Sequence, residues 1–306
     1  MSLPAAIKWR VVQLSAAVAK RAPEVAGALA PLAGDLAWLL AAGPRAAVAD
    51  NLCFLQPAAE PALLRRQARS VFRSVASYYV DLLRLPALNA RWFDRRLRVD
   101  GYEHLAAAVA RGTGVIIAGL HLGPAEIVLQ GLSARGIRYT AMVERLDPPQ
   151  VAALLLRIRE SHGETYLYPS MRDTKRLIRV LRGGGVVAML IDRDVLGTGI
   201  EASFCGGTVR VPVGAIELAR LTGATVIPAA ARWRSGRLYG VTVMPPFVPA
   251  AGRKDHAGLR RDIERLLAVL EPHLRRAPGD WLVLQRLWPA PTHGRGAAYT
   301  GLHADL

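Results

Sequence analysis

The spacing of hydrophobic positions changes character near residue 100. Before that point the apolar side chains recur every three or four residues, which is typical of one face of an α-helix. Residues 62–85 show this spacing most clearly, and Pro86 predicts the end of the helix. The apolar positions of this segment are Leu64, Ala68, Val71, Val75, Tyr78 and Leu82.

After residue 100, short β-branched runs alternate with helical segments. This alternation predicts an α/β fold with a mainly parallel central sheet flanked by helices, preceded by an N-terminal helical layer. We expect one domain over 1–306, with a helical N-terminal part at 1–98 and an α/β core at 99–290. Residues 193–211 are expected to form a loop. Strands are expected at 114–120, 139–143, 164–169, 186–192, 224–233 and 237–245, and helices at 123–134, 148–162, 173–184, 213–223 and about 256–276.

Two N-terminal segments have the composition of helices at a membrane surface. Residues 25–43 have the length of a membrane span, but Pro31, Gly34 and Asp35 at their centre favour one or two buried or interfacial helices. Residues 7–22 combine basic side chains with an apolar face and Trp9. They indicate either a helix in an anionic headgroup layer or an ordinary surface helix packed on the core.

The charge balance points to an anionic partner without identifying it. The chain has 40 Lys and Arg residues against 24 Asp and Glu residues, for a formal charge of +16. Nucleic acid, an anionic lipid surface and a phosphorylated substrate all fit this charge, and a coding bias toward arginine explains it equally well. The basic residues are dispersed and no nucleic-acid-binding signature is present, so we expect no nucleic-acid partner.

Several kinds of site are absent from the sequence. Cys53 and Cys205 lie far apart, which predicts neither a disulfide framework nor a metal site and suits a reducing compartment. No Gly-x-Ser-x-Gly motif and no Walker loop occurs. We therefore expect no metal and no bound cofactor.

One motif has a position suited to catalysis. The predicted strand 114–120 ends just before His121, and Glu126 follows in the first turn of the next predicted helix. Open α/β sheets bind ligands at this edge, where a neutral imidazole can remove a proton from an alcohol and a carboxylate can fix its tautomer. The spacing alone is weak, because a histidine beside a strand is often only a structural residue.

Longer blocks resemble the lysophospholipid acyltransferase superfamily, whose signature is a histidine, four residues and an acid. The likeness is greatest to the branch that holds the lipid A secondary acyltransferases and the mycobacterial phosphatidylinositol mannoside acyltransferase. It extends from about residue 30 to 288. The similar blocks are "GDLAWL" (34–39), "DNLCFL" (50–55) and residues 101–126, 142–169 and 183–228, the last containing "DRD".

The resemblance implies acyl transfer from acyl-CoA or acyl-carrier protein to a hydroxyl of a membrane glycolipid. It implies that His121 is the general base, that Glu126 orients it, and that Glu201 lies beside it and helps to orient it. It further implies that Glu144, Arg145 and Arg159 bind the donor or the acceptor head group, although a solvated charged loop explains Glu144 and Arg145 as well. For the turn at 192–194, a structural ion pair is favoured over direct catalysis.

The "RDVLGTGIE" turn resembles the mannoside acyltransferase more than the lipid A enzymes, so the resemblance implies a phosphatidylinositol mannoside as the acceptor, over lipid A or another lysolipid. Departures from the pattern leave the acceptor open: Glu126 replaces the usual Asp, "HLGPAE" is unusual, and Cys205 replaces a Phe. The charge and the N-terminal helices predict a peripheral enzyme on the cytoplasmic face of the plasma membrane. A non-catalytic protein that binds lipid at a membrane surface is the remote alternative.

Overall fold

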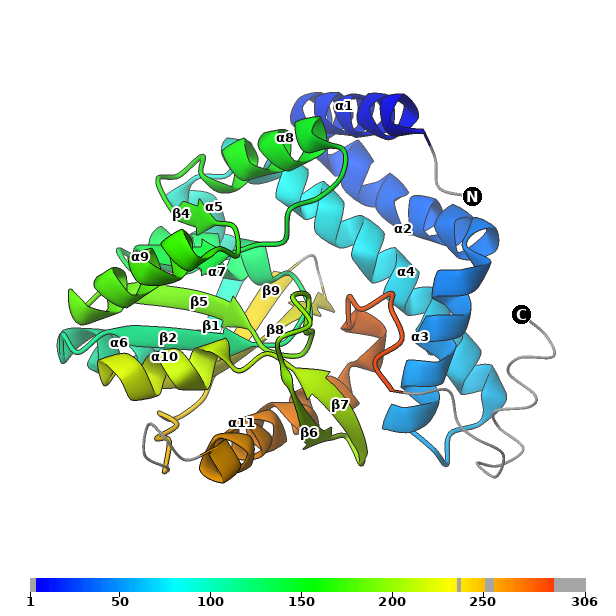
Figure 1. The fold of residues 1–306 in the computed structure, drawn as a ribbon. Helices are drawn as coiled ribbons and strands as arrows, with labels where there is room; N and C mark the ends of the chain where they lie inside the picture. The colour runs from blue at the N-terminus through cyan, green and yellow to red at the C-terminus, as the bar shows by residue number, and fades with distance from the viewer. Residues whose placement is uncertain (1–3, 236–237, 251–255, 289–306) are drawn as a thin grey trace.

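The computed structural model describes residues 4–235, 238–250 and 256–288 (Figure 1). Its N-terminal part is helical, as predicted. The long helix expected at 62–85 is confirmed by α4, which begins at a proline and ends where Pro86 enters a short 3₁₀ turn. The elements of this part are α1 (Ala5–Arg21), α2 (Pro23–Leu40), α3 (Ala42–Leu55), α4 (Pro61–Arg84), η1 (Leu85–Ala87) and α5 (Ala90–Arg96).

The centre of the protein is a seven-stranded sheet in the order β1-β9-β8-β2-β5-β3-β4. All neighbouring strands are parallel except β8 and β9, which are antiparallel. The predicted α/β class with a mainly parallel sheet is therefore confirmed. The strands are β1 (Leu97–Asp100), β2 (Val115–Gly119), β3 (Tyr139–Met142), β4 (Thr165–Leu167), β5 (Val186–Leu190), β8 (Thr225–Arg234) and β9 (Leu238–Val243).

Helices cover both faces of the sheet. Every residue of β2 is buried, and its side chains alternate between two hydrophobic clusters. Ile116 and Ala118 pack with α9, α10 and α11 on one face, whereas Val115 and Ile117 pack with α5, α6, α7 and α8 on the other. The apolar run at 114–120 thus has the burial expected of a parallel strand. The remaining helices are α6 (Tyr102–Ala110), α7 (Ala125–Ser133), α8 (Pro149–Arg159), α9 (Met171–Arg182), α10 (Gly214–Thr222) and α11 (His256–Arg276).

The predicted loop at 193–211 is wrong in its second half. Residues there form an antiparallel hairpin of β6 (Ile200–Phe204) and β7 (Gly207–Val211). Cys205 and Gly206 both have positive φ angles, the backbone conformation that a tight two-residue hairpin turn requires. The buried face of the hairpin packs on the core, where Phe204 stacks with Trp288 at 6.0 Å.

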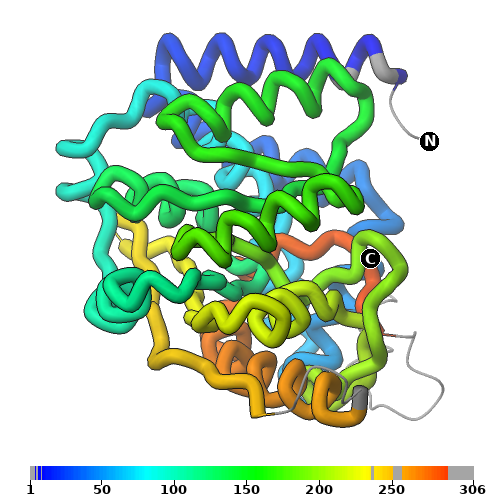
Figure 2. The backbone as a smooth tube through the Cα atoms, turned by 60° about the vertical axis from the view of Figure 1, so that its left-hand side comes forward, coloured from blue at the N-terminus to red at the C-terminus, as the bar shows by residue number. Residues whose placement is uncertain are grey.

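The N-terminal helices present apolar side chains to the outside. α1 lies along one edge of the molecule beside α8 (Figure 2). Trp9 packs against the core, whereas one face of α1 and one of α2 are exposed. No single helix within the described ranges is long and apolar enough to cross a membrane, but α2 and α3, which meet at 99°, pass that test as a bent pair.

Candidate active site

Three neighbouring strands bring polar side chains to one edge of the sheet. β2, β5 and β3 lie next to one another and run parallel, so their carboxyl ends share an edge. His121, Asp192 and Glu144 each follow the last residue of one of these strands by two positions. The predicted placement of His121 at this edge is confirmed. Ligands bind at this edge in open α/β sheets.

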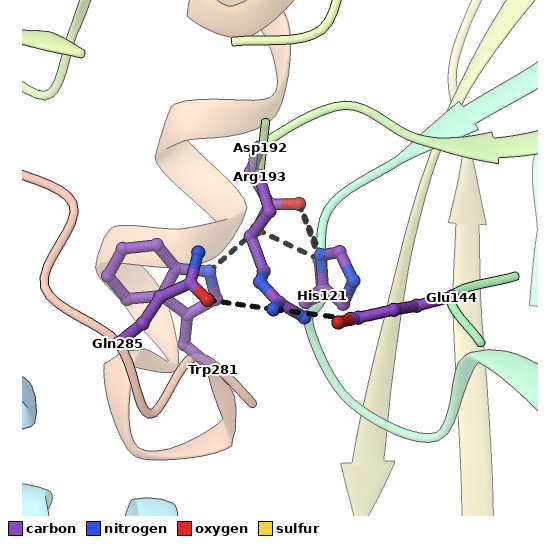
Figure 3. A network of polar contacts seen from close by, with 6 residues as sticks. All are labelled: His121, Glu144, Asp192, Arg193, Trp281 and Gln285. Atoms are coloured by element: carbon purple, nitrogen blue, oxygen red, sulfur yellow. Dashed lines mark hydrogen bonds and ion pairs between the residues drawn. The ribbon is translucent and has the colours of Figure 1, made fainter. Parts of the chain in front are cut away.

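Asp192 is the carboxylate that holds His121 (Figure 3). Its Oδ1 lies 2.7 Å from Nδ1 of the imidazole, and both carboxylate oxygens accept from the main-chain N–H of His121 at 3.0 and 3.1 Å. The indole N–H of Trp281 donates to Oδ2 at 2.8 Å. Asp192 has no exposed surface, and these donors hold it in a single orientation.

This arrangement fixes the proton on the imidazole ring. Burial raises the pKa of Asp192, but the charge of His121 and the hydrogen bonds from His121 and Trp281 outweigh it, so the pKa lies below its usual value. An ionised Asp192 requires that Nδ1 carry the proton, which leaves the lone pair of neutral imidazole on Nε2. Within the described residues Nε2 makes no hydrogen bond, and 23% of the His121 side chain is exposed. Nε2 is thus suited to accept a proton from a bound molecule.

A segment near the C-terminus clamps the histidine loop. Leu282 N–H donates to the carbonyl oxygen of His121 at 2.7 Å, and Gly123 N–H donates to that of Asp280 at 2.9 Å. Gly123 has a φ of +66°, and a Cβ there would lie 2.7 Å from the main chain of Ala231. Only glycine fits this turn. Both the backbone and the imidazole of His121 are therefore held in place.

Glu126 does not occupy the position predicted for it. Its Oε1 accepts a short hydrogen bond from the Tyr78 hydroxyl and pairs with the Arg159 guanidinium, at 3.0 Å from Nη2 and 3.1 Å from Nε. Four residues separate Glu126 from His121, and the first turn of α7 directs the carboxylate toward α4 and α8. The acid that contacts the ring is Asp192.

Arg159 is buried as well as paired. Only 8% of the residue is exposed, and its guanidinium carbon lies 5.9 Å from the centre of the Tyr166 ring. Burial raises the pKa of Tyr78 well above its usual value, as does the charge of Glu126, so the hydroxyl remains a donor. The structure thus joins the two predicted residues Glu126 and Arg159 in one buried network, away from Nδ1 of His121.

Glu144 lies beside the histidine in an exposed position (Figure 3). Arg193 connects it to the C-terminal segment, with Nη2 at 3.5 Å from the Glu144 carboxylate and 2.8 Å from Oε1 of Gln285. Arg145 points elsewhere, and its guanidinium carbon lies 4.5 Å from the centre of the Tyr168 ring. Glu144 is therefore placed to meet a molecule bound at His121.

Glu201 is not joined to His121. It lies on β6 opposite Arg210, with an exposed side chain, and the hydrogen bonds of His121 do not include it. The orienting position predicted for Glu201 is filled by Asp192. The sequence analysis favours a structural ion pair for the turn that contains Asp192 and therefore misses its contact with His121. The available signal was that Asp192 follows a strand end as His121 does.

No metal site is found among the described residues, since no three His, Cys, Asp or Glu side chains are grouped to hold an ion. Both cysteines are free, and burial raises the pKa of Cys53 to about 11. These thiols are neutral near pH 7 and lack the low pKa of a reactive cysteine. His121 remains the group with the geometry for proton transfer.

Comparison with known proteins agrees with the resemblance in the sequence. A family described as bacterial lipid A biosynthesis acyltransferase matches residues 2–290. A phosphatidylinositol mannoside acyltransferase of Mycobacterium tuberculosis (strain ATCC 25618 / H37Rv) is 33% identical over 223 residues, which are 71% of this chain and 68% of that protein. A phosphatidylinositol mannoside acyltransferase of Mycolicibacterium smegmatis is 27% identical over 225 residues, 72% of each protein. The chain therefore belongs to the bacterial lipid A biosynthesis acyltransferase family and is an acyl-transferring enzyme.

Proposed function

We propose that the protein transfers a fatty acyl group from an acyl thioester to a hydroxyl of a phosphatidylinositol mannoside, with His121 as the general base. The observation that carries the proposal is the His121–Asp192 pair at the carboxyl edge of the sheet, with Nε2 left available. The mannoside as acceptor is supported by the names of the relatives in two mycobacterial species.

The reaction follows from the protonation state of the pair. Nε2 accepts the proton of the acceptor hydroxyl while the hydroxyl oxygen attacks the thioester carbonyl carbon. Asp192 stabilises the resulting imidazolium. The tetrahedral intermediate collapses, its C–S bond breaks, and the imidazolium returns the proton to the sulfur. The products are an ester and a free thiol. No metal or bound cofactor takes part, and acyl-CoA or acyl-carrier protein is a co-substrate.

Two charged side chains at this edge, Arg193 and Glu144, are placed to bind substrate. Arg193, held between Glu144 and Gln285, presents a cation close to His121, where a donor phosphate or an acceptor head group would approach. We assign Glu144 to the acceptor hydroxyls, because an exposed carboxylate accepts hydrogen bonds from sugar hydroxyls.

The proposed place of action is the cytoplasmic face of the membrane. A charge of +16 and the exposed apolar faces of α1 and α2 support a peripheral attachment to an anionic surface. This location would also give the enzyme access to thioester donors made in the cytoplasm.

Thiol release and product mass test the proposal together. Purified protein is incubated with palmitoyl-CoA or an acyl-carrier-protein donor and with phosphatidylinositol mannosides or lipid A precursors. We expect acylated mannoside and a loss of about 10²–10⁴-fold in turnover for His121→Ala. His104→Ala is the matched control, because His104 follows β1, which runs opposite to β2 and so ends at the other edge of the sheet.

Each result decides one part of the proposal. Equal turnover in wild type and His121→Ala would exclude His121 as the base. If lipid A precursors are acylated and the mannoside is not, the acceptor is a lipid A precursor and the proposed mannoside is wrong. Lipid binding without thiol release from any donor would favour a non-catalytic lipid-binding protein.

A further inference from the structure

A pocket lined by arginines lies among the N-terminal helices. Its volume is about 440 Å³, and it lies where the end of α2 meets the start of α3 and the first half of α4. None of its residues belongs to the His121 site. The lining consists of Trp38, Leu39, Arg45, Arg65, Arg66, Arg69 and Arg73.

The lining of the pocket is rich in positively charged side chains. Asp35 is the carboxylate at the pocket, where it accepts from Arg69 at 2.7 and 2.8 Å and from Arg73 at 2.6 and 2.7 Å. Hydrogen bonds from Arg73 and Arg69 hold the pKa of Asp35 below its usual value, so it stays ionised. Five arginines thus line the pocket, and two of them pair with Asp35. The planar fork of a guanidinium matches the oxygens of a phosphate group.

Close helix packing holds these arginines in place. A Cβ at Gly34 would lie 2.5 Å from Cα of Arg73, so glycine is needed for α2 to approach α4 this closely. Arg45 Nη1 donates to the carbonyl oxygen of Trp38 at 2.8 Å, and its guanidinium lies 5.5 Å from the centre of the Trp38 ring. The pocket is therefore formed by backbone packing and anchored side chains.

Exposed leucines border the pocket. Leu39, which lines it, is 69% exposed, and its neighbour Leu40 is 76% exposed. They end an apolar stripe along α2 whose members recur at helical spacing: Val25, Leu29, Leu32, Leu36, Leu39 and Leu40. A similar stripe on α1 consists of Ile7, Val11, Leu14 and Val18. Exposed apolar rows of this extent mark interaction surfaces.

We propose that this pocket binds the phosphate of an anionic phospholipid while the apolar stripe of α2 contacts its acyl chains. A phosphate group alone would explain the arginines, and an apolar surface alone would explain the leucines. A phospholipid explains both, because it joins an anionic head group to hydrocarbon at one place. The site is separate from His121, and the proposal does not depend on acyl transfer.

Vesicle binding by matched charge variants tests the proposal. The full chain is mixed with phosphatidylcholine vesicles with and without phosphatidylglycerol, and binding is measured by sedimentation. Arg65→Gln with Arg66→Gln removes two charges from the pocket and leaves the Asp35 pairs intact. Arg179→Gln with Arg182→Gln removes two exposed charges from α9, on the opposite side of the molecule from α3 (Figure 1).

We expect the pocket variant to lose about tenfold or more in affinity for the anionic vesicles, and the α9 variant to lose much less. Leu36→Ser with Leu39→Ser should also weaken binding, and glycerol phosphate at the concentration of the lipid should not compete. His121→Ala should bind the vesicles as wild type does, which separates this test from the proposed acyl transfer. Melting curves check folding, and the single exposed variant Arg66→Gln replaces the double variant if the latter unfolds.

Three results would overturn the proposal. Equal losses for the pocket and α9 variants would indicate diffuse electrostatic attraction. Competition by glycerol phosphate without an effect of the leucine variant would indicate a soluble phosphate ligand. Unchanged vesicle binding in the pocket variant, with turnover lost only for carrier-protein donors, would indicate a docking site for that acidic protein.

Discussion

Asp192 and Glu126 are two carboxylates with different kinds of partner. Asp192 accepts hydrogen bonds from a histidine and an indole, and the histidine can gain and lose a proton. Glu126 faces Arg159, a permanent cation, and the hydroxyl of Tyr78. The first pair can respond to a proton moving during a reaction, whereas the second keeps constant charges. We therefore assign to Asp192 the support of proton transfer by His121. We assign to Glu126 a structural role, in which its contacts join α4, α7 and α8.

The strongest test of this assignment is Asp192→Asn. The amide removes the negative charge that keeps the proton on Nδ1 and stabilises the imidazolium, so turnover should fall about 10³-fold or more. Kinetics with a saturating thioester measure this change. Turnover near the wild-type value would move the orienting role to another acid.

Asp192→Asn should also change how stability depends on pH. Because the folded pKa of Asp192 is depressed, it stabilises the fold above the ordinary pKa of the carboxyl and loses this contribution as the pH falls through the folded value. The free energy of unfolding, measured with urea, should fall more steeply in acid for wild type than for the variant.

Trp281→Phe tests the same side of the comparison more gently. The change removes the indole donor at 2.8 Å and keeps an aromatic ring in a buried position. The loss of one hydrogen bond to a charged group, about 1.5 kcal/mol, should lower kcat about tenfold. KM should stay constant, because the imidazole is affected and the substrate contacts are not. A change in KM alone would contradict a positioning role.

Glu126→Gln tests the other side. We expect less than about tenfold loss of turnover but a loss of about 3 kcal/mol in the free energy of unfolding, because the charge of Arg159 is left buried without its partner. Glu126→Gln combined with Arg159→Met should regain part of that stability. Complete loss of turnover in a fully folded Glu126→Gln protein would show that Glu126 takes part in catalysis and is not only structural.

The smallest effect concerns Asp280, beside Trp281 in the clamp. Burial raises its pKa to about 6, although a hydrogen bond from Ser74 lowers it. A raised pKa contributes stability that is present below pH 3.8 and is lost as the pH rises toward about 6, opposite in sign to Asp192. Asp280→Asn should remove this slope, on the order of 1 kcal/mol per pH unit, from the free energy of unfolding measured across that range.

The sequence predicts the sheet well because parallel strands are buried on both faces and appear as short apolar runs. It does not predict the β6–β7 hairpin, because Gly197, Gly199 and Gly206 make this segment look like a loop. Burial of alternate residues against α11 and Trp288, which only the fold creates, makes those residues strands.

The site is predictable in part for a similar reason. His121 is found because a strand end precedes it. Its partner Asp192 is 71 residues away, and the pairing of β2 with β5, aligned at Gly119 and Leu190, brings the two together. Glu126 is near in sequence, but the first turn of α7 points it toward Tyr78. Strand order and register decide which acid contacts the histidine, and neither can be predicted from the spacing of residues near His121.

The contacts of Trp281 and Leu282 with the histidine loop have a consequence for the order of events during synthesis. The strands that carry His121 and Asp192 leave the ribosome long before the segment that fixes them. A nascent chain can therefore bury its sheet while its proton-transfer pair is still unsupported. We therefore expect the proposed proton-transfer pair to become fully supported only after residue 282 has emerged, long after His121 and Asp192 themselves.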